Sequence, residues 1–198
     1  MESTEKNLSA QESLRVIRET IDLAKSGFRE DGFHFLLWGW LVAIASATDW
    51  YLAVIQHDER HSMAWIIMVV IGIPVAMIRE WHLGKRQKSQ NIVRNWYGLI
   101  WLGYAISMIL AIPMAVRIGV SPVPFILVLT GFATFMSGVL LKFKPLLIGA
   151  AVFWAGALWC MFLSTDQHLL IQSATAILGY LIPGYLLNNL SKNHVPGT

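Results

Sequence analysis

Six apolar stretches, each about as long as a membrane-spanning helix, occupy most of this 198-residue chain. A helix needs about 20 mostly apolar residues to cross a hydrocarbon core that is about 30 Å thick. Only 14% of the residues are charged, and these gather at the chain ends and between the apolar stretches. The charged share of soluble domains is about 25%, so the composition argues against a soluble fold. The sequence predicts an all-α fold, a polytopic membrane helix bundle.

The limits of the predicted spans follow the apolar composition. We expect six transmembrane helices in three hairpins, at residues 32–55, 63–78 or 63–81, 95–116, 122–141, 145–163 and 168–187. The chain then divides into a cytoplasmic N-terminal segment (1–31), the six-helix transmembrane domain (32–187) and a cytoplasmic C-terminal tail (188–198).

Lysine and arginine are distributed unevenly between the two predicted sides of the membrane. Thirteen of the 15 fall in the segments on the side of both termini, and only Arg60 and Arg117 fall on the other side. Basic residues are retained in the cytoplasm, so we predict that both termini lie there. The same asymmetry accounts for the net charge of +3, and we expect no nucleic-acid partner.

Small residues recur at four-residue intervals in the first, third and fifth predicted spans, each time shortly after a tryptophan. They are Gly39 and Ala43, Gly103 and Ser107, and Gly156 and Cys160. Residues four apart lie on one helix face, and close backbone approach along such faces holds membrane helices together. We predict that these residues form the packing seams of a threefold hairpin repeat. The alternative is chance alignment, because small residues are common in membrane helices.

The N-terminal segment carries the signature of an amphipathic helix. Ser9 and Glu12 form a capping box, and Leu14, Ile17, Ile21 and Phe28 then recur at helical spacing. The first 31 residues hold seven acids and five bases, whereas a helix that binds anionic lipid is more basic. We therefore predict that this helix contacts protein: the cytoplasmic face of the bundle itself, a second copy in a homo-oligomer, or a cytoplasmic partner.

Two predicted outer loops carry the residues that could bind a metal ion. They are His57 and His61 in the first outer loop, and Asp166 and His168 in the last. Imidazole and carboxylate groups are ligands of divalent ions, and histidines beside acids can also sense pH. The alternative is a solvated polar loop. The sequence shows no hydrolase, metalloprotease or phosphate-loop motif, so we expect neither catalytic residues nor a cofactor.

One resemblance supports the topology. Residues 12–24, followed by the sequence Phe-Leu-Leu-Trp-Gly-Trp at 35–40, resemble a family of small uncharacterised bacterial inner-membrane proteins. The resemblance implies a cytoplasmic N-terminal helix, six spans and a bacterial inner membrane. It transfers no catalytic or ligand-binding residues.

Two functional hypotheses remain open at this point. The first is a non-catalytic scaffold or regulatory membrane protein that acts through helix packing and its cytoplasmic helix. The second is a passive channel or carrier for a small, largely uncharged solute, whose path Thr130, Thr134, Ser173 and Thr175 would line. Prolines that interrupt spans, such as Pro183, also occur at transporter sites. Ionisable residues are nearly absent from the span centres, which argues against ion-driven transport.

Overall fold

The described part of the chain is almost entirely helical. The computed structural model describes Arg15 and residues 32–84 and 92–192, and these ranges contain no strand. Their helices are α2 (Phe33–Trp50) with the π-helix η1 (Tyr51–Ile55), α3 (Met63–Gly84), α4 (Ile92–Arg117), α5 (Val123–Leu141), α6 (Lys144–Cys160), and α7 (Thr165–Ala176) with the π-helix η2 (Ile177–Leu181) and α8 (Ile182–Lys192). The prediction of an all-α fold is confirmed.

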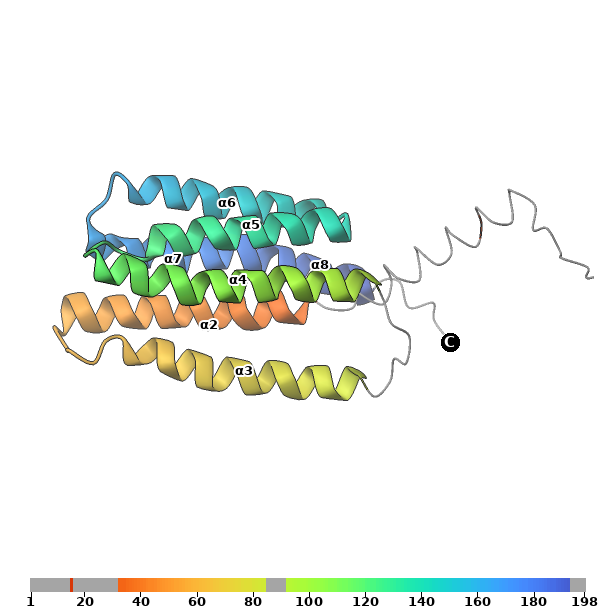
Figure 1. Cartoon of the computed structure of the whole chain (residues 1–198), viewed down its shortest axis with the longest axis horizontal. Helices are drawn as coiled ribbons and strands as arrows, with labels where there is room; N and C mark the ends of the chain where they lie inside the picture. Colours follow the sequence, from red (N-terminus) through yellow and green to blue (C-terminus); the bar gives the residue numbers. More distant parts are fainter. Residues whose placement is uncertain (1–14, 16–31, 85–91, 193–198) are drawn as a thin grey trace, which may run out of the picture.

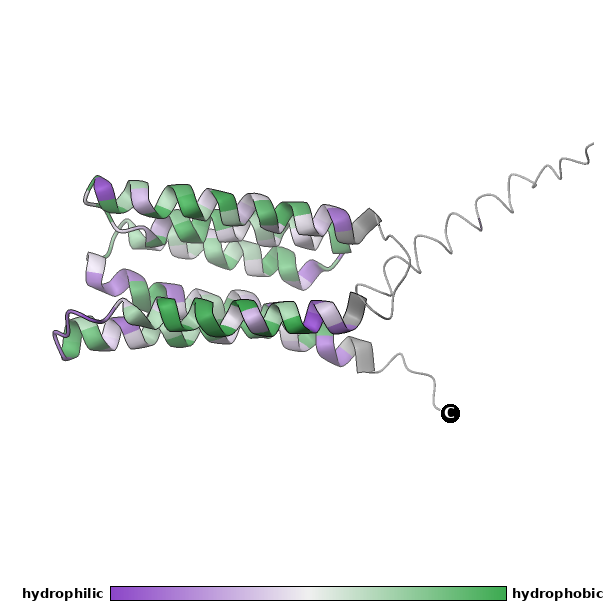
Figure 2. Ribbon diagram, turned by 60° about the horizontal axis from the view of Figure 1, so that its bottom comes forward, coloured by the Kyte–Doolittle hydropathy of each residue, from purple (hydrophilic) through white to green (hydrophobic). Residues whose placement is uncertain are grey.

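These helices have the composition of a membrane-embedded protein. Five continuous helices are long and apolar enough to cross a membrane, namely Phe33–Ile55, Met63–His82, Asn95–Arg117, Val123–Leu141 and Thr165–Asn189. The apolar helix Lys144–Cys160 is shorter, and its 17 residues rise about 26 Å. Hydrophobic residues fill the middle of the helices, and hydrophilic residues lie mostly near the helix ends (Figure 2).

The helices run side by side (Figure 1), and each is antiparallel to the next in the chain, except that α7, η2 and α8 form one continuous helix. The connections 56–62, 118–122 and 161–164 lie at one end of the bundle, which we call the loop end. Helix α2 packs against α7 and α3, while α5 packs against α6 and α4. Since α3 contacts mainly α2, and α4 contacts mainly α5, these two helices form the edges of the bundle.

Aromatic rings fill the centre of the bundle where α2, α4, α6 and η2 meet. The Tyr180 ring packs against Phe153 at 4.8 Å between centroids and against Phe35 at 5.9 Å. The Phe35 ring also contacts Trp101 of α4 at 6.4 Å. Offset and edge-on pairs of this kind are favoured by the ring quadrupole, and each buried ring contributes a large apolar area.

Helix α6 and η2 approach each other backbone to backbone at Gly149 and Gly179. Pro183 has no N–H, so the Gly179 carbonyl lacks the donor that an uninterrupted helix would supply. The Ile182 N–H instead donates to the Ile177 carbonyl, which is the hydrogen bond of a π-turn. The Gly179 carbonyl lies directly against Gly149, where a Cβ atom would collide with it. This contact therefore requires glycine at position 149.

We predict that Gly149→Ala destabilises the protein, because the added methyl group meets backbone that cannot rotate away. Overpacking of this kind costs about 1–3 kcal/mol of the free energy of unfolding. Gly103→Ala is the matched control, since among the described residues no other helix and no side chain beyond its chain neighbours comes within 4 Å of a Cβ at Gly103. Thermal unfolding in detergent measures both variants, and we expect a lower Tm for Gly149→Ala alone. Equal Tm values for the two variants would contradict the contact.

Candidate functional site

A buried carboxylate joins α2 to α3 at the loop end of the bundle. Asp49, in the last turn of α2, is only 5% exposed. The Trp65 Nε1–H donates to Asp49 Oδ2 at 2.6 Å, and His61 Nδ1 lies 2.5 Å from Asp49 Oδ1. A carboxylate only accepts hydrogen bonds, so His61 Nδ1 carries the hydrogen. We call Asp49, His61 and Trp65 the loop-end clamp.

The connection between α2 and α3 positions the two donors. His57 adopts a left-handed backbone conformation with φ of 53°, which turns the chain. Asp58 Oδ1 then accepts from the Arg60 N–H at 2.8 Å, and the Asp58 carbonyl accepts from the His61 N–H at 3.2 Å. The chain becomes helical directly afterwards. Residues 61 and 65 are four positions apart, so their side chains reach the same neighbour.

Polar contacts also hold the other end of α3. His34 Nε2 lies 2.9 Å from Glu80 Oε1, and the Arg79 guanidinium lies over the Phe33 ring at 4.2 Å from its centroid. Between the two ends, Gly72 lets the Trp38 side chain approach the α3 backbone. The loop-end clamp and the His34–Glu80 pair therefore add polar contacts at both ends of α3 to its packing against α2.

The loop-end clamp pairs a histidine and a tryptophan from one helix end with a carboxylate of the neighbouring helix. A histidine oriented by a carboxylate occurs in catalytic triads and beside bound metals, where a nucleophile or further ligands complete the site. Within residues 32–84 and 92–192, no three His, Cys, Asp or Glu side chains come together as metal ligands would. The clamp satisfies an otherwise costly buried charge, and it ties two helices together.

The structure does not bring the four predicted metal ligands together. The His61 ring is engaged by Asp49, and His57 is exposed in the connection. Asp166 is exposed in the first turn of α7. His168 turns inward, and its Nε2 lies 2.9 Å from the carbonyl oxygen of Cys160, which it caps at the end of α6. The bundle thus uses two of these residues for helix contacts.

Sequence reasoning assigned no role to Asp49, which is the central residue of the clamp. One signal was present, because an acid within an apolar run is costly and calls for a partner. The identity of that partner depends on the turn at residues 57–62, which no periodicity in the sequence predicts.

The predicted seam residues of the first and fifth spans lie in helix contacts. Gly39 lies against the Leu181 side chain, and Gly156 lies against Thr175. Cys160 is buried. Ala43 is also buried, and its carbonyl accepts from the Ser173 hydroxyl at 2.9 Å. These contacts join α2 and α6 to the last helix.

The third span differs, because α4 turns a different face toward the bundle. Tyr104 and Trp101 point inward, and Gly103, next to Tyr104, has open space where its side chain would be. Ser107 is half-buried, and its hydroxyl donates to the Gly103 carbonyl in its own helix at 2.8 Å. Within the described residues, Gly103 and Ser107 therefore do not form a seam with another helix.

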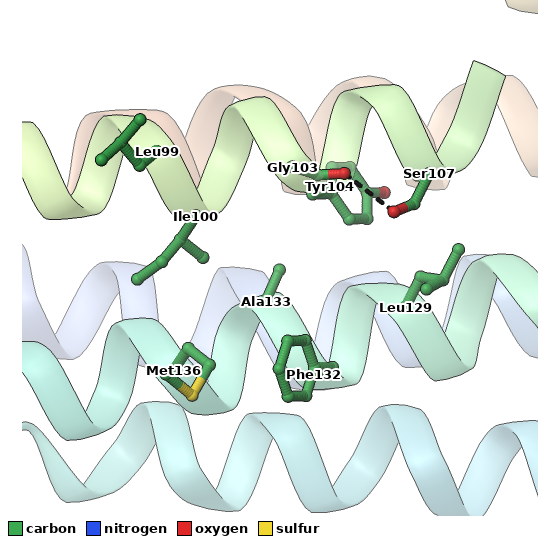
Figure 3. Close-up of a pocket in the computed structure, with 9 residues that line it drawn as sticks. All are labelled: Leu99, Ile100, Gly103, Tyr104, Ser107, Leu129, Phe132, Ala133 and Met136. Atoms are coloured by element: carbon green, nitrogen blue, oxygen red, sulfur yellow. Dashed lines mark hydrogen bonds between the residues drawn. The ribbon is translucent and has the colours of Figure 1, made fainter. Parts of the chain in front are cut away.

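Gly103 and Ser107 instead line a shallow groove between α4 and α5, with a volume of about 280 Å³ (Figure 3). Leu129 and Phe132 of α5 form part of the opposite wall. The hydroxyls in the groove are already bonded, since Tyr104 Oη lies 2.9 Å from Thr130 Oγ1. The groove therefore suits apolar material such as a lipid tail.

The candidate interaction residues Leu14, Ile17, Ile21 and Phe28 lie outside the described residues. Comparison of the chain with protein-family models, with curated proteins and with solved structures finds no match.

We predict that Asp49→Ala lowers the stability of the protein, because it leaves the Trp65 N–H and the His61 ring without their acceptor. Hydrogen bonds to a charged group contribute about 1.5–3 kcal/mol to stability. Asp166→Ala removes an exposed carboxylate and serves as the control. Thermal unfolding should show a lower Tm for Asp49→Ala only. A double-mutant cycle with Trp65→Phe should show coupling, and additive effects would contradict the direct contact.

Proposed function

We propose that this chain is a non-catalytic scaffold or regulatory protein of the bacterial inner membrane. It acts through helix packing and through the amphipathic helix predicted for its N-terminal segment. It works as a homo-oligomer or with a cytoplasmic protein partner, and it spans the membrane six times with both termini in the cytoplasm.

The hydrogen bonds of the interior hydroxyls carry this proposal. The Thr134 hydroxyl donates to the Thr130 carbonyl at 2.7 Å, and the Thr175 hydroxyl donates to the Ile171 carbonyl at 2.8 Å. The Ser173 hydroxyl donates across to α2. A solute path would need these groups to face a polar space, whereas here they are used within and between packed helices. The arrangement favours a scaffold over the alternative, a passive channel or carrier.

The arrangement of the helix ends supports the six-span, three-hairpin topology. Arg60 and Arg117 belong to the loop end, whereas Arg79, Lys142 and Lys144 belong to the opposite end, where residues 32 and 192 also lie (Figure 1). Because basic residues are retained in the cytoplasm, the loop end faces outward. The helix Lys144–Cys160 then crosses as the fifth span despite its shorter length, since the bilayer thins locally around a short helix at modest cost.

We predict that a cysteine replacing Asp58 is labelled from outside intact cells, whereas one replacing Lys88 is not. Both are introduced into a Cys160→Ala background and exposed to a membrane-impermeant maleimide. Labelling of both positions after the cells are permeabilised is the control. The reverse pattern would overturn the topology.

The proposed role of the N-terminal helix is tested with the double variant Ile17→Ser, Ile21→Ser. Burial of a large apolar side chain contributes about 1.5–3 kcal/mol, so two losses should weaken a contact made by this helix. We expect a smaller oligomer or lost cross-links in the membrane, with the Tm of the bundle unchanged. The double variant Glu19→Ser, Asp22→Ser changes the polar side of the same helix and serves as the control. If the Ile17→Ser, Ile21→Ser variant matches the control variant in oligomer size, cross-linking and protease access, the scaffold hypothesis is refuted.

A further inference from the structure

Four buried side-chain atoms lack a hydrogen-bond partner within the described part of the chain. They are Ser46 Oγ, Trp101 Nε1, His168 Nδ1 and Gln172 Oε1. Three of the four belong to α2 and α7, which pack against each other. Buried polar atoms nearly always have a partner, because leaving one unpaired forfeits its hydration without a replacement. Three such atoms on two facing helices therefore require an explanation.

Helix geometry places Ser46 and Gln172 at nearly the same height along the axes of α2 and α7. The Ser173 hydroxyl bonds the Ala43 carbonyl, so residue 172 of the antiparallel α7 lies opposite residue 44 of α2. Ser46 is two residues further along α2, which is an offset of about 3 Å. His168 lies one helical turn from Gln172, toward the loop end.

The neighbours of these residues show that both side chains face the interior of the bundle. Ser46 lies between Ala43, which meets α7, and Asp49, which meets α3. Gln172 lies between Ser173, which meets α2, and Ile171, which meets Gly156 of α6. Ser46 is completely buried and Gln172 is 2% exposed.

The three atoms have matching chemistry. The Cys160 carbonyl can only accept a hydrogen bond, so His168 Nε2 carries the hydrogen, which leaves Nδ1 as the acceptor of that imidazole tautomer. Gln172 Oε1 is also an acceptor, and the Ser46 hydroxyl can accept as well as donate. Together they offer acceptors to a molecule that brings its own donors.

We propose that Ser46, Gln172 and His168 form an internal site for a small hydrogen-bond donor of the size of water or an ammonium ion. Such a guest satisfies the acceptors of both helices at once and bridges α2 to α7. Asp49, one turn from Ser46, adds negative charge nearby, but its two oxygens already accept from the loop-end clamp. The proposal does not depend on the scaffold function, because it concerns only the interior of the bundle.

The test compares Ser46→Ala and Gln172→Met, each close in shape to the original side chain, in the full-length protein in detergent. If a guest bridges these groups, each variant loses part of that bridge and the Tm falls. If no guest is present, each variant removes an unpaired polar atom, and the Tm stays the same or rises. Ser137→Ala is the matched control, because Ser137 is equally buried and bonds the Ala133 carbonyl of its own helix. A Tm that is unchanged or raised in both test variants overturns the proposal.

The double variant tests whether the two residues share one guest. If both residues bind the same guest, either single substitution already removes most of it. The fall in Tm of the double variant should then be smaller than the sum of the falls in the two single variants. Strictly additive falls would overturn a common site. The Tm is then measured in equal concentrations of ammonium chloride and of sodium chloride to identify the guest. A higher Tm in ammonium for the wild type, absent in the double variant, identifies ammonium, and equal Tm values in the two salts identify water.

Discussion

The backbone contact between Gly149 and Gly179 is the constraint on which the packing of the bundle depends. Apolar helices in lipid gain little from hydrophobic burial, so they associate where their backbones can approach closely. Pro183 and the π-turn free the Gly179 carbonyl, and Gly149 leaves room for it. This approach brings Tyr180 into the centre, where its ring joins Phe153 of α6 to Phe35 of α2.

The edge helices depend on different interactions. Helix α3 lacks such a close backbone seam with the core, and polar pairs hold it at both ends, through Asp49 at one end and Glu80 at the other. Helix α4 is joined to the core by the Trp101 ring and by the hydrogen bond between Tyr104 and Thr130. These directional contacts add to packing against a single neighbouring helix, which leaves much of both edge helices exposed for contact with lipid or with another protein.

The distribution of polar atoms separates two regions of the interior. Around Thr134 and Ser137 the hydroxyls bond carbonyls of their own helix, and the Thr134 hydroxyl also lies 3.5 Å from the Tyr180 hydroxyl, so these polar groups have partners within the protein. Around Ser46 and Gln172 the polar atoms of facing helices have no such partner within the described residues. The proposed site for a small polar guest lies in this second region.

Local composition was enough to predict where the helices lie. The expected segment 122–141 corresponds to α5 (Val123–Leu141), because an apolar segment in lipid must satisfy its backbone within its own helix. The same local information could not decide which helix face is buried. Gly103 and Gly156 have the same pattern of neighbours in the sequence, yet only Gly156 meets another helix. The sequence by itself determined the helices and their apolar character. Only the tertiary structure decided their rotation and the partners of Asp49, because these depend on contacts between residues far apart in the chain.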